Sequence, residues 1–226
     1  MTDNRVTPLQ AAGIVARPNG PLLVHGDVAL YRRRVVESEH GEPLTWLTTE
    51  RLEVGERFAL CRCGQSGRKP FCDGTHAKVG FAPQDTASGS YDERSNELGG
   101  TGITVRDDRS ICVHAGFCGT RLANVWGQVP ETGESTVRAQ VIAMVEKCPS
   151  GALTYSIGAD VVEPLLPRAI AVTDDGPLWV TGGVPVTMSN GTELEVRNRV
   201  TLCRCGESAN KPLCDGSHRT AGFTDH

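Results

Sequence analysis

The sequence has few aromatic residues, no long hydrophobic run and no excess of positive charge. Aromatic side chains make up 5% of the 226 residues and hydrophobic side chains 38%, which is little for one large core. We therefore expect small lobes that depend partly on bound metal. The net charge of −4 argues against nucleic acid as the main partner, because phosphate binding needs a basic surface. No stretch approaches the roughly 20 apolar residues of a membrane span, so we expect no membrane partner either.

Two further absences concern location and catalysis. Residues 1–10 are polar and lack the apolar core of a secretory signal, so we expect a cytoplasmic protein. The sequence contains no G-x-G-x-x-G fingerprint, no P-loop and no nucleophile elbow. The run Gly99-Gly-Thr-Gly102 is expected to form a turn instead. The sequence therefore predicts a protein that is not an enzyme.

What the sequence does contain is cysteine, glycine and proline. The 26 glycines and 13 prolines predict many turns and loops. Nine cysteines is an odd number, and without a signal segment it does not suggest a disulfide scaffold. In a reducing compartment, clustered cysteines are typical of metal ligands or catalytic thiols.

Most of these cysteines belong to an internal repeat. The segment 60–64 (LCRCG) returns at 202–206 and the segment 72–76 (CDGTH) returns as CDGSH at 214–218, both with an offset of 142 residues. Upstream, 19–24 matches 175–180 with an offset of 156, so the first copy has 14 extra residues. These residues fall within the polar stretch 31–55, where we expect a hairpin or a surface loop.

Short alternating runs around 22–30, 178–186 and 194–202 predict strands. Each copy is then a small β-rich lobe followed by a cysteine loop. The segment between the copies begins with a linker at 84–100, which is rich in Ser, Gly, Asp and Glu.

A compact α+β unit is expected at 101–157. Alternation predicts strands at 103–106 and 152–155, and helical spacing of apolar residues predicts an amphipathic helix at 135–147. Ser135 is a candidate cap for the start of this helix, and Pro149 follows its end.

The repeated cysteine pattern is C-x-C-x2-S-x3-P-x-C-D-G-S/T-H. The C-x-C pair can deliver two thiolates to one iron ion, and the C-D-G-S/T-H turn can bring one thiolate and one imidazole to another. Three cysteines and one histidine is also a legitimate zinc set, although C-x-C is tighter than the usual C-x2-C of zinc sites. The candidate ligands are Cys61, Cys63, Cys72 and His76 in the first copy and Cys203, Cys205, Cys214 and His218 in the second.

The pattern resembles that of the CDGSH iron–sulfur family, which includes the NEET proteins. The resemblance implies one [2Fe–2S] cluster per motif, held by three cysteines and one histidine. It also implies a β-rich fold with two small CDGSH lobes, at 12–83 and 165–226, on either side of the α+β unit. Family domains usually act as pairs, so a chain with both motifs is expected to be a monomer with an internal pseudo-dimer.

The three remaining cysteines lie in the central unit, at Cys112, Cys118 and Cys148. A bacterial-type ferredoxin motif has the pattern C-x2-C-x2-C followed by a distant C-P. Aligned with this motif, the three cysteines occupy the first, third and fourth ligand positions, and Ala115 occupies the second. The segment resembles the divergent single-cluster 4Fe–4S family, which implies a ferredoxin-like domain. Three thiolates suit a [3Fe–4S] cluster, whereas a [4Fe–4S] cluster needs a further ligand such as His114 or solvent. Buried thiols without any cluster are the structural alternative.

These assignments use all nine cysteines and leave no thiol for nucleophilic catalysis. The leading functional prediction is an electron-transfer protein with three clusters, whose partners are a reductase and an electron acceptor. The alternative is a cluster donor or a redox or iron sensor, whose partner is a cluster acceptor.

Overall fold

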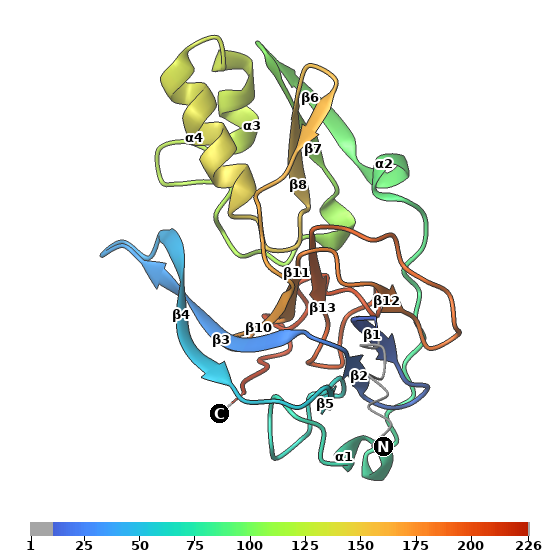
Figure 1. Cartoon of the computed structure of the whole chain (residues 1–226). Coiled ribbons are helices and arrows are strands. Elements are labelled where there is room, and N and C mark those ends of the chain that lie inside the picture. The colour runs from blue at the N-terminus through green and yellow to red at the C-terminus, as the bar shows by residue number, and fades with distance from the viewer. Residues whose placement is uncertain (1–10, 226) are drawn as a thin grey trace, which may run out of the picture.

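The computed structural model describes residues 11–225, so the polar segment 1–10 and His226 lie outside the described residues. The described chain is organised around three β-sheets (Figure 1). Two of them form the lower body in this view, and the third stands above them with helices packed against it. This confirms a β-rich protein with a separate α+β unit.

The structure contains thirteen strands and four α-helices between residues 11 and 225. The strands are β1 (Gly13–Ala16), β2 (Leu22–His25), β3 (Ala29–Glu37), β4 (Pro43–Leu52), β5 (Arg57–Leu60), β6 (Asn96–Gly100), β7 (Ile103–Asp107), β8 (Leu153–Ile157), β9 (Asp160–Val162), β10 (Ala169–Thr173), β11 (Leu178–Thr181), β12 (Val186–Thr187) and β13 (Arg199–Leu202). The helices are α1 (Thr75–Lys78), α2 (Tyr91–Arg94), α3 (Val125–Gln128) and α4 (Ser135–Glu146), with short 3-10 helices at Arg109–Ile111 and Val129–Glu131.

The two terminal repeats exchange strands. β12 of the second repeat pairs in parallel with β1 of the first, and the first sheet has the order β12-β1-β2-β5. β3 of the first repeat pairs in parallel with β10 of the second, and the second sheet has the order β13-β11-β10-β3-β4. The lobes expected at 12–83 and 165–226 are therefore interleaved, because the first sheet includes β12 of the second repeat and the second sheet includes β3 and β4 of the first.

This exchange follows the sequence repeat residue by residue. Ile14 pairs with Val186 in the first sheet, and Ile170 pairs with Leu30 in the second. Both partners shift by the same 156 positions, so an approximate twofold relation connects the two sheets. Self-complementary dimer interfaces have the same reciprocity, in which residue i contacts j and j contacts i. One chain thus contains both halves of a twofold arrangement.

Aliphatic side chains from both sheets form one shared core. Leu22, Leu30 and Leu60 of the first repeat are fully buried, and Ile170 and Leu202 of the second are buried against them. Removing such side chains from water is the main favourable term in folding. The two terminal sheets therefore share a single hydrophobic core, although the chain has few aromatic residues.

The 14 extra residues of the first repeat form part of a β-hairpin, which confirms one of the two expected forms. β3 and β4 pair antiparallel from Leu30 opposite Leu52 out to Glu37 opposite Pro43. In Figure 1 the hairpin extends below the central unit, at the left of the molecule. This placement brings a segment near the N-terminus next to the middle of the chain.

The central unit is a four-stranded antiparallel sheet with α3 and α4 on one face. Its core contains Val105 and Tyr155 of the sheet with Val125, Val141 and Val145 of the helices. Strands β7 and β8 and helix α4 confirm the expected strand, helix and strand. Ser135 is the first helical residue and not the cap, because Glu134 holds the cap position without a side-chain hydrogen bond.

The segment expected as the linker 84–100 is partly structured. Residues 96–100 form β6, which pairs with β7 along its whole length. Leu98 packs on the central core, although its glycine neighbours conceal the strand pattern in the sequence. A Cβ on Gly100 would lie 2.6 Å from the carbonyl oxygen of Val129, so close packing requires glycine here. Strand β9 likewise extends the sheet beyond residue 157.

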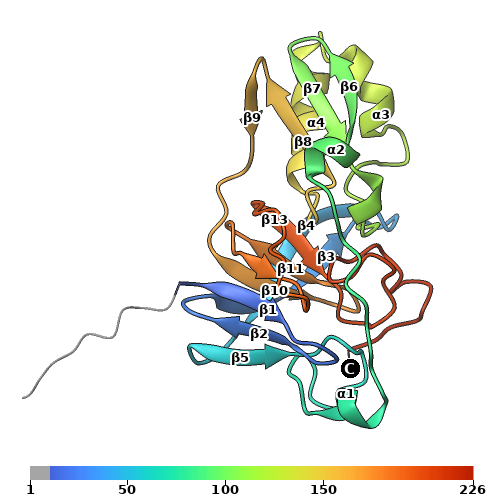
Figure 2. The ribbon, with the colours of Figure 1, turned by 90° about the vertical axis from the view of Figure 1, so that its right-hand side faces the viewer.

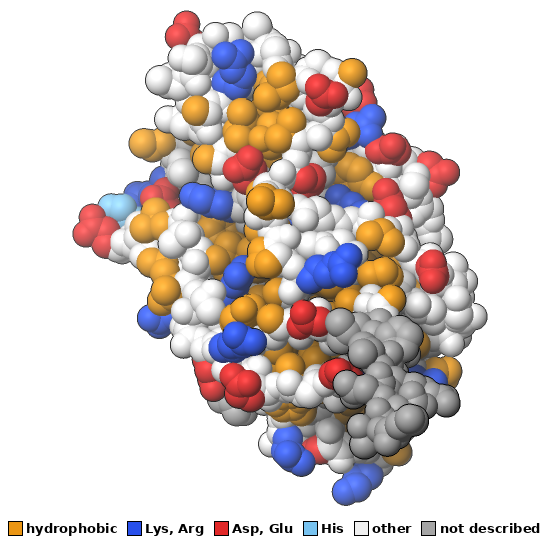
Figure 3. All heavy atoms as spheres, viewed as in Figure 1, with side chains coloured by type: hydrophobic (Ala, Val, Ile, Leu, Met, Phe, Trp, Pro, Cys, Tyr) orange, Lys and Arg blue, Asp and Glu red, His pale blue; other side chains and the backbone are white. Residues whose placement is uncertain are grey.

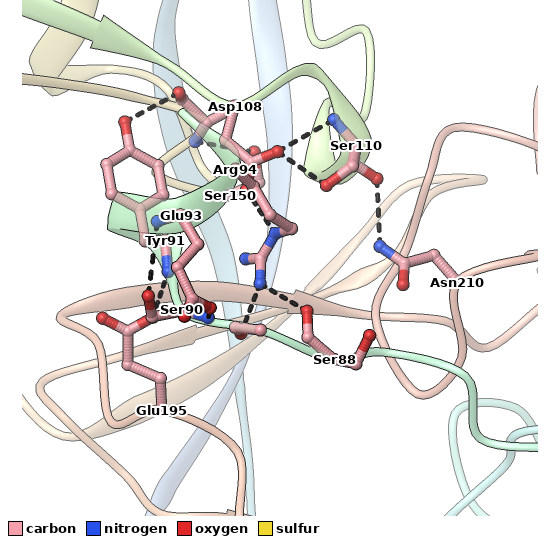
Figure 4. Close-up of polar contacts among 12 residues, drawn as sticks. Ser88, Ser90, Tyr91, Glu93, Arg94, Asp108, Ser110, Ser150, Glu195 and Asn210 are labelled. Carbon is pink, nitrogen blue, oxygen red and sulfur yellow. Dashed lines mark hydrogen bonds and ion pairs between the residues drawn. The ribbon is translucent and has the colours of Figure 1, made fainter. Parts of the chain in front are cut away.

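Polar contacts attach the central unit to the second repeat (Figure 4). Arg94 Nε donates to Asp108 Oδ2 at 2.9 Å, and the backbone nitrogen of Tyr91 donates to Glu195 Oε2 at 2.7 Å. Helix α2 thereby connects the central sheet with the loop before β13. Within residues 11–225, no helix is both long and apolar enough to cross a bilayer.

Candidate metal centres

Each terminal cysteine loop presents its candidate ligands as two pairs. In the first repeat, the Sγ atoms of Cys61 and Cys63 are 3.8 Å apart, and Cys72 Sγ lies 3.3 Å from His76 Nδ1. The equivalent distances in the second repeat are 3.6 and 3.3 Å. Two donor pairs suit a cluster of two iron ions. The second repeat supplies its pairs from Cys203 with Cys205 and from Cys214 with His218.

Backbone hydrogen bonds hold the two pairs of each site side by side. In the first repeat, Cys61 N donates to Pro70 O at 2.8 Å and Cys72 N donates to Ala59 O at 2.9 Å. The second repeat makes the equivalent bonds at 2.9 Å each. Strands β5 and β13 lead directly into these bonds, so the sheets position the donors.

Ser66 and Asp73 shape the first loop from within. Ser66 Oγ donates to Phe71 O at 2.7 Å, and the Asp73 carboxylate accepts from the backbone nitrogens of Gly67 and Thr75, both at 2.9 Å. The hydrogen bonds from Thr75 and Gly67 hold the pKa of Asp73 below its usual range. Ser208 and Asp215 make the matching contacts in the second loop.

The two loops meet across the approximate twofold axis. A Cβ on Gly64 would collide with the carbonyl group of Cys205, and a Cβ on Gly206 would lie 2.9 Å from Cys63 O. Both glycines have φ values in the left-handed region, +77° and +91°, which other residues rarely adopt. The backbones of the two sites therefore touch each other through glycine.

A buried arginine stands between the two cysteines of each C-x-C pair. Arg62 binds Asp85 at 2.7 Å and Arg204 binds Asp225 at 2.8 Å, and all four side chains are almost wholly buried. A buried cation with a carboxylate and hydrogen-bond partners stays charged. Each C-x-C pair therefore has a buried ion pair at its central residue, in which the carboxylate balances the charge of the guanidinium.

Burial and hydrogen bonding shift the pKa values of several candidate ligands. It raises the pKa of Cys63 to about 11 and that of Cys214 to about 12, so both thiols hold their protons at neutral pH. The hydrogen bond from Cys205 lowers the pKa of Cys203 to about 6 and raises that of Cys205. Burial, assisted by Arg219 and Arg204, lowers the pKa of His218 to about 4. The neutral imidazole is the form that binds metals.

The three central cysteines surround one cavity of about 160 Å³. Cys112 lies at the end of the 3-10 helix 109–111, Cys118 packs beside α3, and Cys148 follows α4. Ala115 also lines the cavity, as expected for the ligand position that lacks a thiol. Burial, with smaller contributions from Cys112 and Cys148, raises the pKa of Cys118.

His114 stands between this cavity and the second repeat. Its backbone is left-handed, with φ of 55°, and its carbonyl oxygen accepts a hydrogen bond from Arg219 at 2.6 Å. Its ring lies against Gly216, where a Cβ would be 2.5 Å from His114 Cδ2. Because Gly216 lies between Cys214 and His218, the loop of the central site contacts the loop of the C-terminal site. Whether His114 is a ligand stays a prediction.

A cleft of about 560 Å³ opens next to this contact. Its walls include Trp46 of the β3–β4 hairpin, His114 of the central loop and His218 of the second repeat. Trp46 stacks between Phe117 and Trp179, with ring centroids 5.1 Å from each. The hairpin thus braces the central loop against the second sheet, a role that its polar sequence did not indicate.

Arg199 is a second residue that sequence reasoning missed. It is 1% exposed and donates to the carbonyl oxygens of Val145 at 2.7 Å and of Cys148 at 2.9 Å, while Glu163 pairs with it at 2.8 Å. A cation at the C-terminal end of a helix complements the helix dipole, here that of α4. Its counterpart in the first repeat is Arg57, which is exposed. No local pattern therefore separates the two arginines.

The donor sets fit clusters of several iron ions. Between residues 11 and 225, no three His, Cys, Asp or Glu side chains are grouped tightly enough to hold a single metal ion. The donors stand in pairs at the terminal sites and around a cavity at the central site. Thiolates in such positions are the ligands that iron–sulfur clusters take in proteins.

Comparison with protein families agrees with this geometry. A family model for iron-binding zinc fingers of the CDGSH type matches residues 19–77 and 175–219. A second model, for divergent 4Fe–4S mono-cluster domains, matches residues 98–158. No curated protein matches the chain. The chain therefore contains two CDGSH-type regions on either side of a divergent 4Fe–4S mono-cluster domain, and this arrangement supports iron–sulfur cluster binding.

Proposed function

We propose that this chain is an electron-transfer protein. It carries two [2Fe–2S] clusters on its Cys3His sets and a [3Fe–4S] or [4Fe–4S] cluster on the three central cysteines. Iron–sulfur clusters supply reversible one-electron chemistry when bound. The observation that carries the proposal is the contact of His114 with Gly216, which joins the loop of the central site to that of the C-terminal site. Centres that only store iron have no need of such a contact.

The residues around the sites suit this role. The thiols of Cys61, Cys63, Cys203 and Cys205 are buried, which limits the access of water to whatever they hold. A neutral histidine in place of a fourth thiolate makes a site less negative. This difference in charge favours the reduced state and raises the reduction potential.

The proposal assigns no catalytic residue to this chain. Each of the nine cysteines serves as a ligand, so none is free to act as a nucleophile. The partners are accordingly a reductase that supplies electrons and a protein that accepts them.

Iron and sulfide analysis of anaerobically purified protein, combined with EPR spectra, tests the ligand sets. Two [2Fe–2S] clusters and a three- or four-iron cluster give about 7 or 8 iron per chain. Cys112→Ser should remove only the iron of the central cluster and its EPR signal. A value near about 4 in the wild type, with matching sulfide, contradicts the central cluster.

The second candidate function is cluster donation or redox sensing. The observation that favours it is the partial exposure of Cys72 and His76 at the N-terminal site. Reversible reduction by a ferredoxin reductase, with all clusters retained, supports electron transfer. Movement of clusters to an apo-ferredoxin without a change of redox state supports donation instead.

A further inference from the structure

The two CDGSH loops have the same motif and different surroundings. Cys214 is 1% exposed and His218 8%. Their counterparts Cys72 and His76 are each partly exposed. Figure 2 places α1, which follows Cys72, at the end of the molecule remote from the central unit. The two sheets are therefore related by the twofold axis, but the solvent exposure of the two CDGSH sites differs.

The central unit covers the C-terminal loop. The His114 ring lies on Gly216, and Arg219 Nη1 donates to His114 O at 2.6 Å. Asn210 Nδ2 donates to Ser110 O at 3.1 Å, as Figure 4 shows. By contrast, a Cβ placed on Gly74, the counterpart of Gly216, would have no atom within 4 Å.

The N-terminal loop is also the more basic of the two. Residues 65–80 contain three basic and one acidic residue, whereas the matching residues 207–222 contain two of each. Arg68 and Lys78 are exposed where the second loop has Asn210 and Thr220. The one acidic side chain, Asp73, is hydrogen-bonded to backbone amides of its own loop.

A further basic residue lies at the edge of this loop. The turn between β1 and β2 carries the exposed Arg17, and a Cβ on Gly20 in the same turn would lie 3.8 Å from His76 Nε2. Figure 3 shows lysine and arginine side chains at the lower end of the molecule, where Figure 1 places α1. The half-open site thus carries a positive surface on a chain of net charge −4.

We propose that the N-terminal CDGSH loop is the docking surface for an acidic partner protein, and that the central unit occupies the equivalent surface of the C-terminal loop. This inference rests on the proposed function, since the partner is the protein that exchanges electrons or a cluster with the chain. Complementary charge steers such encounters and orients the partner on the exposed site. A partner docked at the N-terminal site would leave the central and C-terminal sites shielded from solvent.

The test measures binding of an acidic plant-type ferredoxin to the full chain at about 50 and about 300 mM NaCl, because salt screens exposed charges. The double variant Arg68→Glu/Lys78→Glu reverses the charge of the N-terminal loop. Thr220→Glu adds a negative charge at the position in the second loop that matches Lys78, and serves as the control. Arg68, Lys78 and Thr220 are all exposed. Their replacement should leave folding and cluster content unchanged.

We expect the wild-type affinity to fall about tenfold between the two salt concentrations. The double variant should bind about tenfold more weakly at low salt and lose its salt dependence, while Thr220→Glu stays within about twofold of wild type. No wild-type binding at low salt, or an equal loss in Thr220→Glu, overturns the proposal. Iron content and cluster spectra of the same samples test the proposed function separately, so clusters without ferredoxin binding would refute the docking surface alone.

Discussion

At the residue scale, Gly74 and Gly216 show how one motif position acquires two different environments. Their φ values are 88° and 90°, so any side chain would be strained equally at both. Only Gly216 has neighbours within reach of a Cβ, namely the ring of His114 at 2.5 Å and the carbonyl oxygen of Cys112 at 3.3 Å. The second glycine is therefore required both by the turn and by the contact between two sites.

We predict that Gly216→Ala is more damaging than Gly74→Ala. Gly74→Ala should cost only backbone strain, about 1 to 2 kcal/mol. Gly216→Ala should cost about 1 to 3 kcal/mol more, because the new methyl group displaces the His114 ring. Denaturation midpoints measure both. In a His114→Ala background the difference between the two glycine substitutions should shrink to the cost of the remaining contact with Cys112 O at 3.3 Å. Equal costs in the presence of His114 would contradict the packing described here.

Asp225 gives the pH dependence that belongs to this scale. Burial alone raises the pKa of Asp225, but the charge and hydrogen bond of Arg204 outweigh it and the net pKa is below the ordinary value. A carboxylate with a lowered folded pKa stabilises the protein above its unfolded pKa, about 3.9. This contribution disappears as the pH falls through the lower, folded value.

We predict that Asp225→Asn lowers stability by about 3 kcal/mol at neutral pH, because it leaves the buried Arg204 without its counter-charge. The difference from wild type should narrow as the pH falls below about 4. Unfolding curves of both proteins across this range measure it. Asp174→Asn, at an exposed position nearby, is the control and should differ from wild type by less than about 0.5 kcal/mol. A pH-independent difference would argue against the ion pair.

At the scale of elements, the β3–β4 hairpin connects three parts of the molecule. Trp46 Nε1 donates to Lys147 O at 3.3 Å, and Lys147 Nζ donates to Leu44 O at 2.8 Å. The Trp46 ring also contacts Phe117, which is adjacent to the candidate ligand Cys118. The insertion that distinguishes the first repeat from the second therefore supports the central site.

We predict that Trp46→Ala destabilises the central site selectively. Loss of a partly buried indole should cost about 2 to 4 kcal/mol, somewhat less than for a fully buried one. The central cluster should then be lost faster, with little change at the N-terminal site. EPR signals followed during storage in air distinguish the two sites. Leu47→Ala, on the exposed side of the same strand, is the control and should have little effect. Equal effects of the two variants would show that Trp46 does not support the central site.

At the scale of the whole molecule, the two terminal sheets have an approximate twofold relation, but the central unit covers only the C-terminal CDGSH loop. The strand exchange relates the two CDGSH sites, and the central unit then shields one of them. Solvent and small molecules reach His76 more readily than His218. Two sites with identical ligand types should therefore behave differently.

We predict that a chelator removes the [2Fe–2S] clusters in two phases, the N-terminal site first. The reason is access, since Cys72 and His76 are partly exposed. Visible absorbance against time gives the rates. His76→Cys should slow only the fast phase and His218→Cys only the slow phase. One shared rate for both clusters would count against the difference in exposure.

Much of the fold was predictable because its signals are local. Alternation at 103–106 and helical spacing at 135–147 are properties of neighbouring residues, and both elements formed as expected. The strand exchange was not predictable in this way, because the pairing of β3 with β10 joins residues about 140 positions apart. β6 was missed because its glycines give no alternating pattern, although Leu98 packs on the core.

The sequence alone determined the chemistry of the candidate sites. Each terminal donor set lies within sixteen consecutive residues, so a motif defines it without reference to the rest of the chain. Tertiary structure alone decided which site is covered, since Gly74 and Gly216 are identical in the motif and differ in the approach of Cys112 and His114. It likewise buried Arg199 and left its counterpart Arg57 exposed. Burial depends on which distant segment packs against a residue, and no local spacing encodes that.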